Sequence, residues 1–466
     1  MMSNQGQPGE VIVPMPEIEQ LDFISEQRNK LKSALLEANN HGSGSSQRAK
    51  PLIQRVPRVL MGVKEDFKKY FEPRLVALGP LHHGNPKFER AERSKLKFTA
   101  LFVRENDTTD DALFNKIMVE IEDLKKCYDP EVIKDYDNEK LAWMFFMDGC
   151  AVLYAVYYGS RGEFEKLKTK VDLMVFAQLD LFLLENQLPY RVLEILIKSA
   201  IDPKKWEQSI TGFIGDNLIT NIPGGQKSQH ADGQGDRQDY AHLLERLRTT
   251  LLTGKKEERR SSMIGEMILS LGDRRKGRKT FRSIKELKES GIYVKPSKRN
   301  SIKNISFSCN IRGRLMMPHL LVDDSTAPKF MNLVALEMCP DFENDFAVTS
   351  YLCFLDSLID TAEDVKELRV RGVLHNYVGS DEEVANLFNK MSRDLVPDQE
   401  MYFDVAEGIR KYCNNPLTIS VAQALYTHFS SPWSFLALLG AILGLLFSAI
   451  QAYFSLPQNK ESGSTP

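Results

Sequence analysis

One uncharged apolar segment near the C-terminus constrains this chain more than any other feature. No charged residue occurs from Phe429 to Asn459, and the part from Trp433 to Leu456 reads WSFLALLGAILGLLFSAIQAYFSL. A helix needs about 20 apolar residues to cross the hydrocarbon core of a bilayer, and this segment supplies them. Its terminal aromatic residues, Trp433 and Tyr453, suit the two interfacial belts of a membrane. We therefore predict one transmembrane helix over residues 431–456, with membrane lipid as its partner; a long buried core helix is the alternative.

Three small residues share one face of the predicted span. Gly440, Gly444 and Ser448 follow one another at intervals of four residues. Small residues at this spacing let two helix backbones approach closely inside a membrane. The spacing therefore indicates a homodimer or heterodimer formed through the span. The frequency of glycine in membrane helices explains the same residues equally well.

The order of segments predicts which side of the membrane holds the body. The span is followed only by a short tail, 457–466, and the N-terminus has neither a basic region nor an apolar run of useful length, so a secretory signal peptide is not expected. We expect a tail-anchored, single-pass protein of the plasma membrane or an endomembrane with a cytosolic body. The glycosylation sequons at Asn106 and Asn304 would matter only if the body were lumenal.

Composition describes a globular body that has no general affinity for polyanions. The 466 residues are 42% hydrophobic and 27% charged, and the formal net charge is −2. We therefore expect no nucleic-acid partner. The segment from Lys255 to Lys303 has 16 Lys and Arg against 6 Asp and Glu, a local charge of +10. This segment is either a solvated insertion or a loop that meets a phosphate surface or an acidic partner.

Three parts precede the tail in the predicted domain organisation. Residues 1–50 hold an amphipathic helix, Pro16 to Ala38, and a flexible linker. Residues 51–430 form the helical body and contain the basic insertion at 255–303. A loop rich in glycine and polar residues at 221–239 interrupts the body. The span at 431–456 completes the series.

Helical periodicity dominates the body, so the predicted fold class is mainly α with a few short strands. The segment Glu139 to Gly159 is apolar nearly all round and predicts a central core helix. Pro189 divides Asp172 to Ala200 into two helices. The best strand candidate, Asn304 to Asp324, predicts a small hairpin or extended pair. Further helices are expected at Phe114 to Tyr128, Asp239 to Leu252, Ser283 to Gly291, Lys329 to Met338, Asp345 to Ile359, Thr361 to Arg371 and Asp381 to Met391.

The search for catalytic chemistry yields isolated groups. Asp148 is an acid inside an apolar helix, which predicts burial with a partner and leaves a catalytic role as the alternative. His82 and His83 are adjacent, a spacing that favours a turn over a shared metal. Glu185 lies with Asn186 and Gln187 at a helix junction, where polar side chains satisfy free backbone groups.

Other motifs support no catalytic or cofactor role. The stretch Gly272 to Thr280 resembles a phosphate loop but has Arg278 in the lysine position, and Asp323-Asp324 is expected to form a turn. We predict no catalytic, metal or cofactor site. The cysteines are too far apart for C-x-x-C zinc sites, and their spacing and apolar neighbours favour buried thiols in a reducing compartment over disulfides. They are Cys127, Cys150, Cys309, Cys339, Cys353 and Cys413.

Several of these segments, in order, resemble a plant family called domain of unknown function 247. The resemblance spans about residues 50 to 456. Leu81 and Ala151 depart modestly from its pattern, where an aromatic residue is usual. The matching pieces are IQRVPRVL (53–60), YFEPRLVALGPLHHG (70–84), FMDGCAVL (146–153), DLFLLENQLPYRVLE (180–194), IKELKESGIYVKPS (284–297), MPHLLVDDSTAPKFMNLVALE (317–337), GSDEEVANLFNKM (379–391) and the apolar C-terminal segment.

The resemblance implies a mostly helical plant protein with a C-terminal span and no assigned catalytic residues. Some grass relatives resemble pollen–stigma recognition determinants of self-incompatibility. We therefore expect a protein-recognition or signalling component whose protein partner is unknown. The alternatives are a membrane-associated enzyme that uses Asp148, His82 or His83, and Glu185, or a peripheral scaffold that binds anionic lipid through the basic stretch.

Overall fold

The structure is a computed structural model, and its contacts divide the chain into two units, Met1–Ala49 and Lys50–Pro466. The predicted N-terminal helix lies outside the described residues except at Arg28, Leu31 and Lys32, which are helical. The structure describes residues 28, 31–32, 52–61, 64–167, 170–220, 239–253, 283–309, 312–342, 345–398, 400–415 and 432–455.

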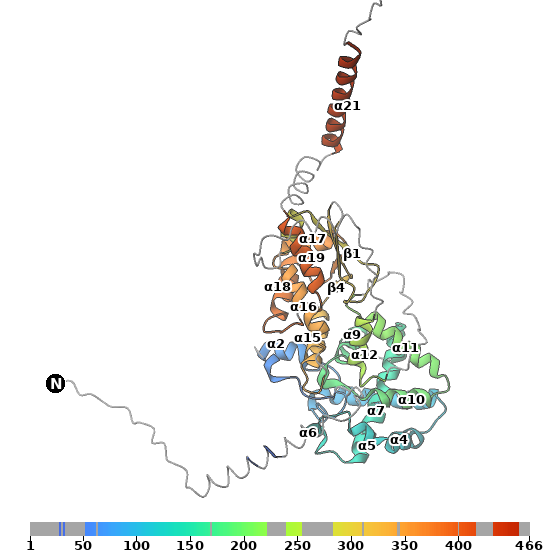
Figure 1. The fold of residues 1–466 in the computed structure, drawn as a ribbon. Coiled ribbons are helices and arrows are strands. Elements are labelled where there is room, and N and C mark those ends of the chain that lie inside the picture. Colours follow the sequence, from blue (N-terminus) through green and yellow to red (C-terminus); the bar gives the residue numbers. More distant parts are fainter. Residues whose placement is uncertain are drawn as a thin grey trace, which may run out of the picture. The chain divides into compact units, whose positions relative to one another are not determined.

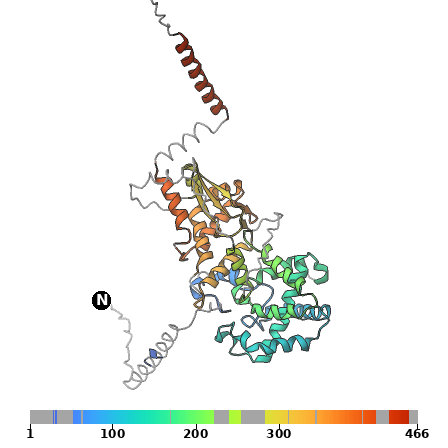
Figure 2. The same cartoon turned by 45° about the vertical axis from the view of Figure 1, so that its right-hand side comes forward.

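Helix α7, Asn138–Ser160, is the centre of one group of helices. Fifteen of its residues are buried, and its weak amphipathicity reflects contact with neighbours on several sides. In Figures 1 and 2 the helices coloured cyan and green gather around it. The prediction of a central core helix here is confirmed. The helices that pack on α7 include α3 (Glu89–Glu105), α4 (Asp110–Val119), α10 (Tyr190–Lys198) and α11 (Pro203–Asp216).

Helix α15, Thr326–Glu337, is the centre of a second group, and all twelve of its residues are buried. A helix whose residues are all buried must be covered by neighbours on every side. Its neighbours come from distant parts of the chain, so α15 joins early and late segments into one core. They include α2 (Lys64–Phe71), α12 (Leu243–Leu252), α16 (Ala347–Leu358) and α18 (Asp381–Met391).

Two small sheets flank the second group. Strands β2 (Ser306–Cys309) and β3 (Gly313–Met317) are antiparallel, which confirms the predicted extended pair. Strand β1 (Ile292–Pro296) adds to β3 in parallel, so the order is β1-β3-β2. The second sheet pairs β4 (Leu320–Val322) with β5 (Leu374–Asn376), also in parallel.

The remaining described elements complete the fold. They are η1 (Arg58–Leu60), η2 (Pro86–Phe88), η3 (Leu184–Asn186), α5 (Ile121–Lys125), α6 (Pro130–Ile133), α8 (Phe164–Leu167), α9 (Val171–Asp180), α14 (Ile284–Glu289), α17 (Ala362–Val370), α19 (Phe403–Asn414) and α21 (Pro432–Ser455).

Most predicted helices are present, and the fold is mainly helical as expected. The predicted helix at Phe114 to Tyr128 is instead two helices, because α4 ends at Val119, Glu120 lies between them, and α5 begins at Ile121. The prediction at Asp381 to Met391 matches α18, which Ser380 caps by accepting a hydrogen bond from Glu383 N.

Parts of two predicted segments lie outside the described residues. The polar loop is undescribed over 221–238, and the basic stretch over 254–282, which includes the phosphate-loop-like sequence. The rest of the basic stretch, from Ser283 to Lys303, contains α14 and β1.

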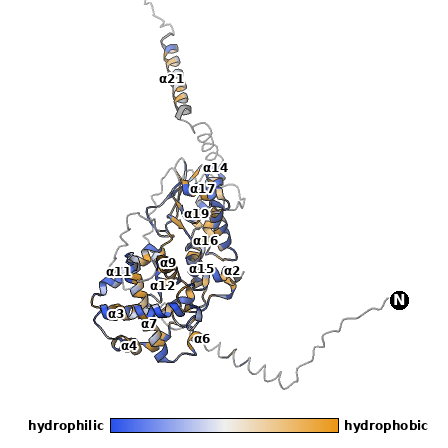
Figure 3. Ribbon diagram, turned by 180° about the vertical axis from the view of Figure 1, so that it is seen from behind, coloured by the Kyte–Doolittle hydropathy of each residue, from blue (hydrophilic) through white to orange (hydrophobic). Residues whose placement is uncertain are grey.

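Helix α21 is the element that the span prediction concerns. It runs without a break from Pro432 to Ser455, and hydrophobic residues predominate along it (Figure 3). Within the described residues, Asn138–Ser160 is the helix that has the length and hydropathy expected of a membrane span. However, 83% of its most apolar segment is buried inside the protein, as expected of a core helix. The part Leu439–Tyr453 of α21 ranks as a shorter apolar helix.

Candidate functional site

Asp148 of α7 is buried, as predicted, and its partner is a lysine. Its Oδ1 lies 2.5 Å from Lys95 Nζ, and its Oδ2 accepts a hydrogen bond from Gly79 N at 2.9 Å. Lys95 Nζ also donates to Ala77 O at 2.9 Å. Burial lowers the pKa of Lys95, but attraction to Asp148 and Glu92 outweighs it, so the pKa is raised. The pair thus joins α3, α7 and the segment before Gly79.

Asp180 and Asn186 hold the main chain of that same segment. The Asp180 carboxylate accepts hydrogen bonds from the N–H groups of residues 74–76 at 2.7 to 3.1 Å. Asn186 Oδ1 accepts from Leu78 N at 2.7 Å. Burial raises the pKa of Asp180 even though these hydrogen bonds oppose the shift. The prediction that polar groups near residue 186 satisfy free backbone groups is confirmed.

The side chains of His82 and Glu185 lie next to each other, whereas the side chain of His83 packs against Tyr136. His82 Nε2 lies 3.3 Å from Glu185 Oε2 without hydrogen-bond geometry, and Glu185 Oε1 accepts from Val56 N at 2.8 Å. The His83 ring meets the ring of Tyr136 edge-on, with centroids 6.3 Å apart. The residues considered for an enzyme therefore do not form one site. The Asp148 carboxylate contacts Lys95 and Gly79, whereas Glu185 contacts His82.

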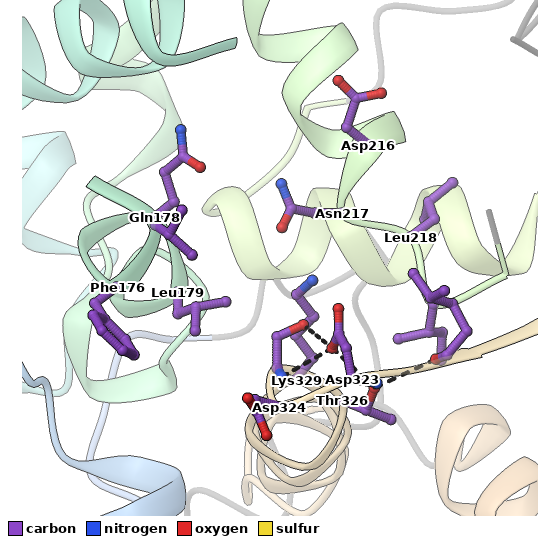
Figure 4. A pocket seen from close by; sticks show the side chains of 14 residues that line it. Phe176, Gln178, Leu179, Asp216, Asn217, Leu218, Asp323, Asp324, Thr326 and Lys329 are labelled. Atoms are coloured by element: carbon purple, nitrogen blue, oxygen red, sulfur yellow. Dashed lines mark hydrogen bonds between the residues drawn. The ribbon is translucent and has the colours of Figure 1, made fainter. Parts of the chain in front are cut away.

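A cavity of about 360 Å³ lies where α9, the end of α11 and the start of α15 meet (Figure 4). Its most unusual group is Lys329 of α15, which is 7% exposed. Burial lowers the pKa of this amine to about 8, although the nearby charge of Asp323 acts in the opposite direction. Lys329, Asp323 and Asn217 face the same space in Figure 4. At neutral pH a measurable fraction of this amine is uncharged and can act as a base or a nucleophile.

Asp323 is held by the turn that begins α15. Its Oδ1 accepts hydrogen bonds from Ser325 N at 2.9 Å, Ser325 Oγ at 2.6 Å and Thr326 Oγ1 at 3.2 Å. The side chain of Asp324 lies apart from it (Figure 4), so the predicted turn at this acid pair is confirmed. The cavity thus holds one cationic side chain and, with Asp216, three carboxylates.

The sequence prediction did not identify Lys95 or Lys329. Lys95 belongs to α3, a helix with many charges, where one more cation resembles a solvated face. Lys329 had a usable signal, since a charged residue within a largely apolar helix is the same pattern that identified Asp148. Within the part of the chain that the structure describes, no group of three His, Cys, Asp or Glu side chains is placed to hold a metal ion.

The other predicted site residues lie on α21 and at the two sequons. On α21, Gly440 and Gly444 have nothing within 4 Å of the position that a Cβ would take, and Ser448 is exposed. Asn106 is 5% exposed, and its Nδ2 donates to Phe102 O at 2.8 Å. Asn304 Nδ2 is also buried. A glycan on either nitrogen would require local unfolding.

All six cysteines lie in described parts of the chain, and all six are free thiols. Four are buried, as predicted, and two are partly exposed. Burial raises the pKa of Cys150 well above its usual range and that of Cys339 to about 12. Thiols with raised pKa values are poor nucleophiles, so these two act as small apolar side chains.

The fold and its buried polar junction are those of a mainly helical protein. A sequence model of domain of unknown function 247, described as "Plant protein of unknown function", matches residues 53–447. The chain therefore belongs to this family.

Two curated relatives come from Arabidopsis thaliana. UPF0481 protein At3g47200 is 28% identical over 423 residues, which cover 86% of this chain and 85% of the relative. Putative UPF0481 protein At3g02645 is 27% identical over 175 residues, 37% of this chain and 33% of that relative. No solved structure matches the fold.

Proposed function

We propose that the protein is a recognition or signalling component held at a membrane by α21, with its body in the cytosol. The observation that carries the anchor is the outer surface of α21. Leu445, Leu446 and Phe447 are consecutive, so they point to different sides of the helix, and they are 72%, 53% and 66% exposed. An uncharged helix with apolar side chains on all sides needs an apolar environment.

Charges placed in α21 test the anchor. Full-length protein is expected to sediment with membranes after alkaline washing, and Leu445→Arg/Leu446→Arg is expected to move it to the supernatant, because each central arginine costs about 2.5 to 3.5 kcal/mol in a bilayer. The matched control, Val119→Arg/Val370→Arg, places the same charges at exposed apolar positions of the body and should still sediment. Wild-type protein that stays in the supernatant refutes the anchor.

Two observations support a cytosolic body. Every cysteine is a free thiol, which suits a reducing compartment. Both sequon asparagines have buried amide nitrogens, whereas an N-glycosylation acceptor must lie on an accessible surface. Protease treatment of sealed membranes should digest the body, and glycosidase treatment should leave its mobility unchanged. A protected, glycosylated body overturns this assignment.

Protein recognition is proposed in preference to catalysis. Asp148, Glu185 and Asp180 are committed to main-chain and ion-pair contacts, which suits structural roles. An exposed apolar face on α9, formed by Val171, Val175 and Phe176, is 41% to 53% exposed and suits a protein interface. Self-incompatibility of the pollen–stigma kind is one setting for such recognition.

Substitutions on α9 test the recognition face. Val175→Glu/Phe176→Glu should abolish proximity labelling of specific membrane neighbours in the protein's own tissue, while Val119→Glu/Val370→Glu should preserve it. Identical neighbour sets for both variants and the wild type contradict the assignment of this face.

The dimer through Gly440 and Gly444 is tested separately: Gly444→Ile should eliminate cross-linked dimers in membranes.

A further inference from the structure

A second cavity, of about 530 Å³, lies between α3, α7, α9 and the segment at residues 74–78. This volume falls in the range of small-molecule sites, roughly 300 to 1,000 Å³. It reaches the surface, because Lys87, Arg90 and Lys170 line it and are exposed. The polar junction at Asp148 borders it only through Lys95.

The charges of this cavity all have one sign. The side chains that line it include five cations, Arg74, Lys87, Arg90, Lys95 and Lys170, and no Asp or Glu. Lys95 is neutralised by Asp148 and Glu92. The other four form no ion pair with the described carboxylates; Lys87 Nζ donates to Pro73 O at 2.8 Å and Arg74 Nη2 to Lys69 O at 3.2 Å. The charge of Arg74 also acts on the nearby Asp180 carboxylate, but positive charge predominates around the opening and attracts an anion.

The walls behind these cations are apolar. Phe98 of α3 stacks on Tyr154 of α7, with centroids 5.7 Å apart, and Met174 and Leu181 are buried. Small side chains at 151 and 155, one helical turn apart on α7, and at 177 on α9 make the space. Apolar side chains that line an empty space lack van der Waals contacts on that side, and an apolar ligand would supply those contacts.

We propose that this cavity binds an anionic amphiphile: one acyl chain that carries a carboxylate or phosphate head. The head meets Arg74, Lys87, Arg90 and Lys170, and the chain lies along Phe98 and the alanines. A neutral lipid would leave the cations unpaired, and a small hydrophilic anion would leave the apolar walls uncovered. Free fatty acids and single-chain phospholipids released from a bilayer share this chemistry. The site is independent of the membrane anchor.

The test uses full-length protein in discs of neutral phosphatidylcholine and a diazirine-bearing fatty acid as the probe. After illumination, labelled peptides are mapped by mass spectrometry. Labels are expected on α3, α7 and α9. Excess oleate, lysophosphatidate, or both should compete, and the competitor that succeeds identifies the source of the head group. Oleyl alcohol should not compete.

Variants at the opening separate charge from folding. Arg90→Glu/Lys170→Glu should reduce labelling of the cavity peptides about tenfold, equivalent to about 1.4 kcal/mol of binding. Arg93→Glu, an exposed position on the same helix outside the cavity lining, should leave labelling unchanged. Ala155→Phe should also reduce labelling by filling the space. Labels confined to α21, equal competition by oleyl alcohol, or insensitivity to the charge reversals would overturn the proposal.

Discussion

Arg248 and Glu337 form a buried ion pair, with Arg248 Nη2 2.7 Å from Glu337 Oε1, and it joins α12 to α15. Glu337 also accepts hydrogen bonds from Val348 N and Thr349 N, both at 2.9 Å, so one carboxylate satisfies the start of α16 as well. Burial raises the pKa of Glu337, although Arg248 and these N–H groups oppose the shift. Three helices therefore depend on one pair.

Removing one partner of this pair should destabilise the protein strongly. Arg248→Met leaves the Glu337 carboxylate buried without its cation, and we expect a loss of about 3 to 5 kcal/mol in the free energy of unfolding. The double variant Arg248→Met/Glu337→Leu should lose less than the sum of the single variants, because neither charge is stranded. Denaturant unfolding of all four proteins measures the coupling, and strict additivity would contradict it.

Gly79 and Gly84 form a matched pair for testing the turn that contains the two histidines. Both have positive φ, +65° and +77°, so alanine at either position costs about 1 to 2 kcal/mol. At Gly79 an added Cβ would also lie 2.9 Å from Gln187 O and 2.9 Å from the Tyr128 hydroxyl, whereas at Gly84 nothing lies within 4 Å. Gly79→Ala should therefore cost about 1 to 3 kcal/mol more than Gly84→Ala in thermal or denaturant unfolding. Equal losses would show that the turn relaxes freely.

His242 should make stability depend on pH. It caps α12 by accepting from Glu245 N at 3.2 Å, and burial lowers its pKa to about 3 from the ordinary 6.5. The unfolded chain therefore takes up a proton on this group below pH 6.5, while the folded chain does not. Stability contributed by neutral His242 is full above pH 6.5 and falls by up to about 1.4 kcal/mol per unit as pH decreases. His242→Asn keeps a capping group and should flatten the curve between pH 6.5 and 5.

Lys329 should titrate near pH 8, far below an exposed lysine. Competitive acylation with acetic anhydride across pH should place its midpoint near 8. The midpoint of Lys126, whose pKa is raised by its hydrogen bond to Asp123, should lie well above that of Lys329. A Lys329 midpoint above 10 would contradict its burial.

The same lysine should weaken the fold at neutral pH. The Lys329 amine keeps its proton up to about pH 10.5 in the unfolded chain and only up to about pH 8 in the folded chain. The free-energy cost of burying the charged amine therefore applies in full below pH 8 and disappears above pH 10.5. Lys329→Met should then stabilise the protein by roughly 1 to 3 kcal/mol at pH 7, with little effect near pH 11.

Local pattern predicted the helices whose apolar stripe or cap is strong, such as α7 and α18. It did not predict α3, because ERAERSKLKFTALFVRE is dense in charge and its buried face depends on contact with α7. The parallel pairs β1–β3 and β4–β5 were also missed, since strands this short form only where tertiary contacts bring them together.

The polar junction was predictable in part. Asp148 was identified as buried because an acid in an apolar helix is conspicuous. Its partner was not, because Lys95 is one of several basic residues on α3 and only the packing shows which of them turns inward.

The bonds from Asp180 to residues 74–76 join positions 104 to 106 apart in the chain. During synthesis at roughly 5 to 20 residues per second, the earlier segment leaves the ribosome roughly 5 to 20 seconds before its acceptor exists. Asn332, which donates to Tyr70 O from 262 residues away, arrives later still. The segment at residues 70–76 therefore cannot complete its native hydrogen bonds until Asp180 and Asn332 have been synthesised.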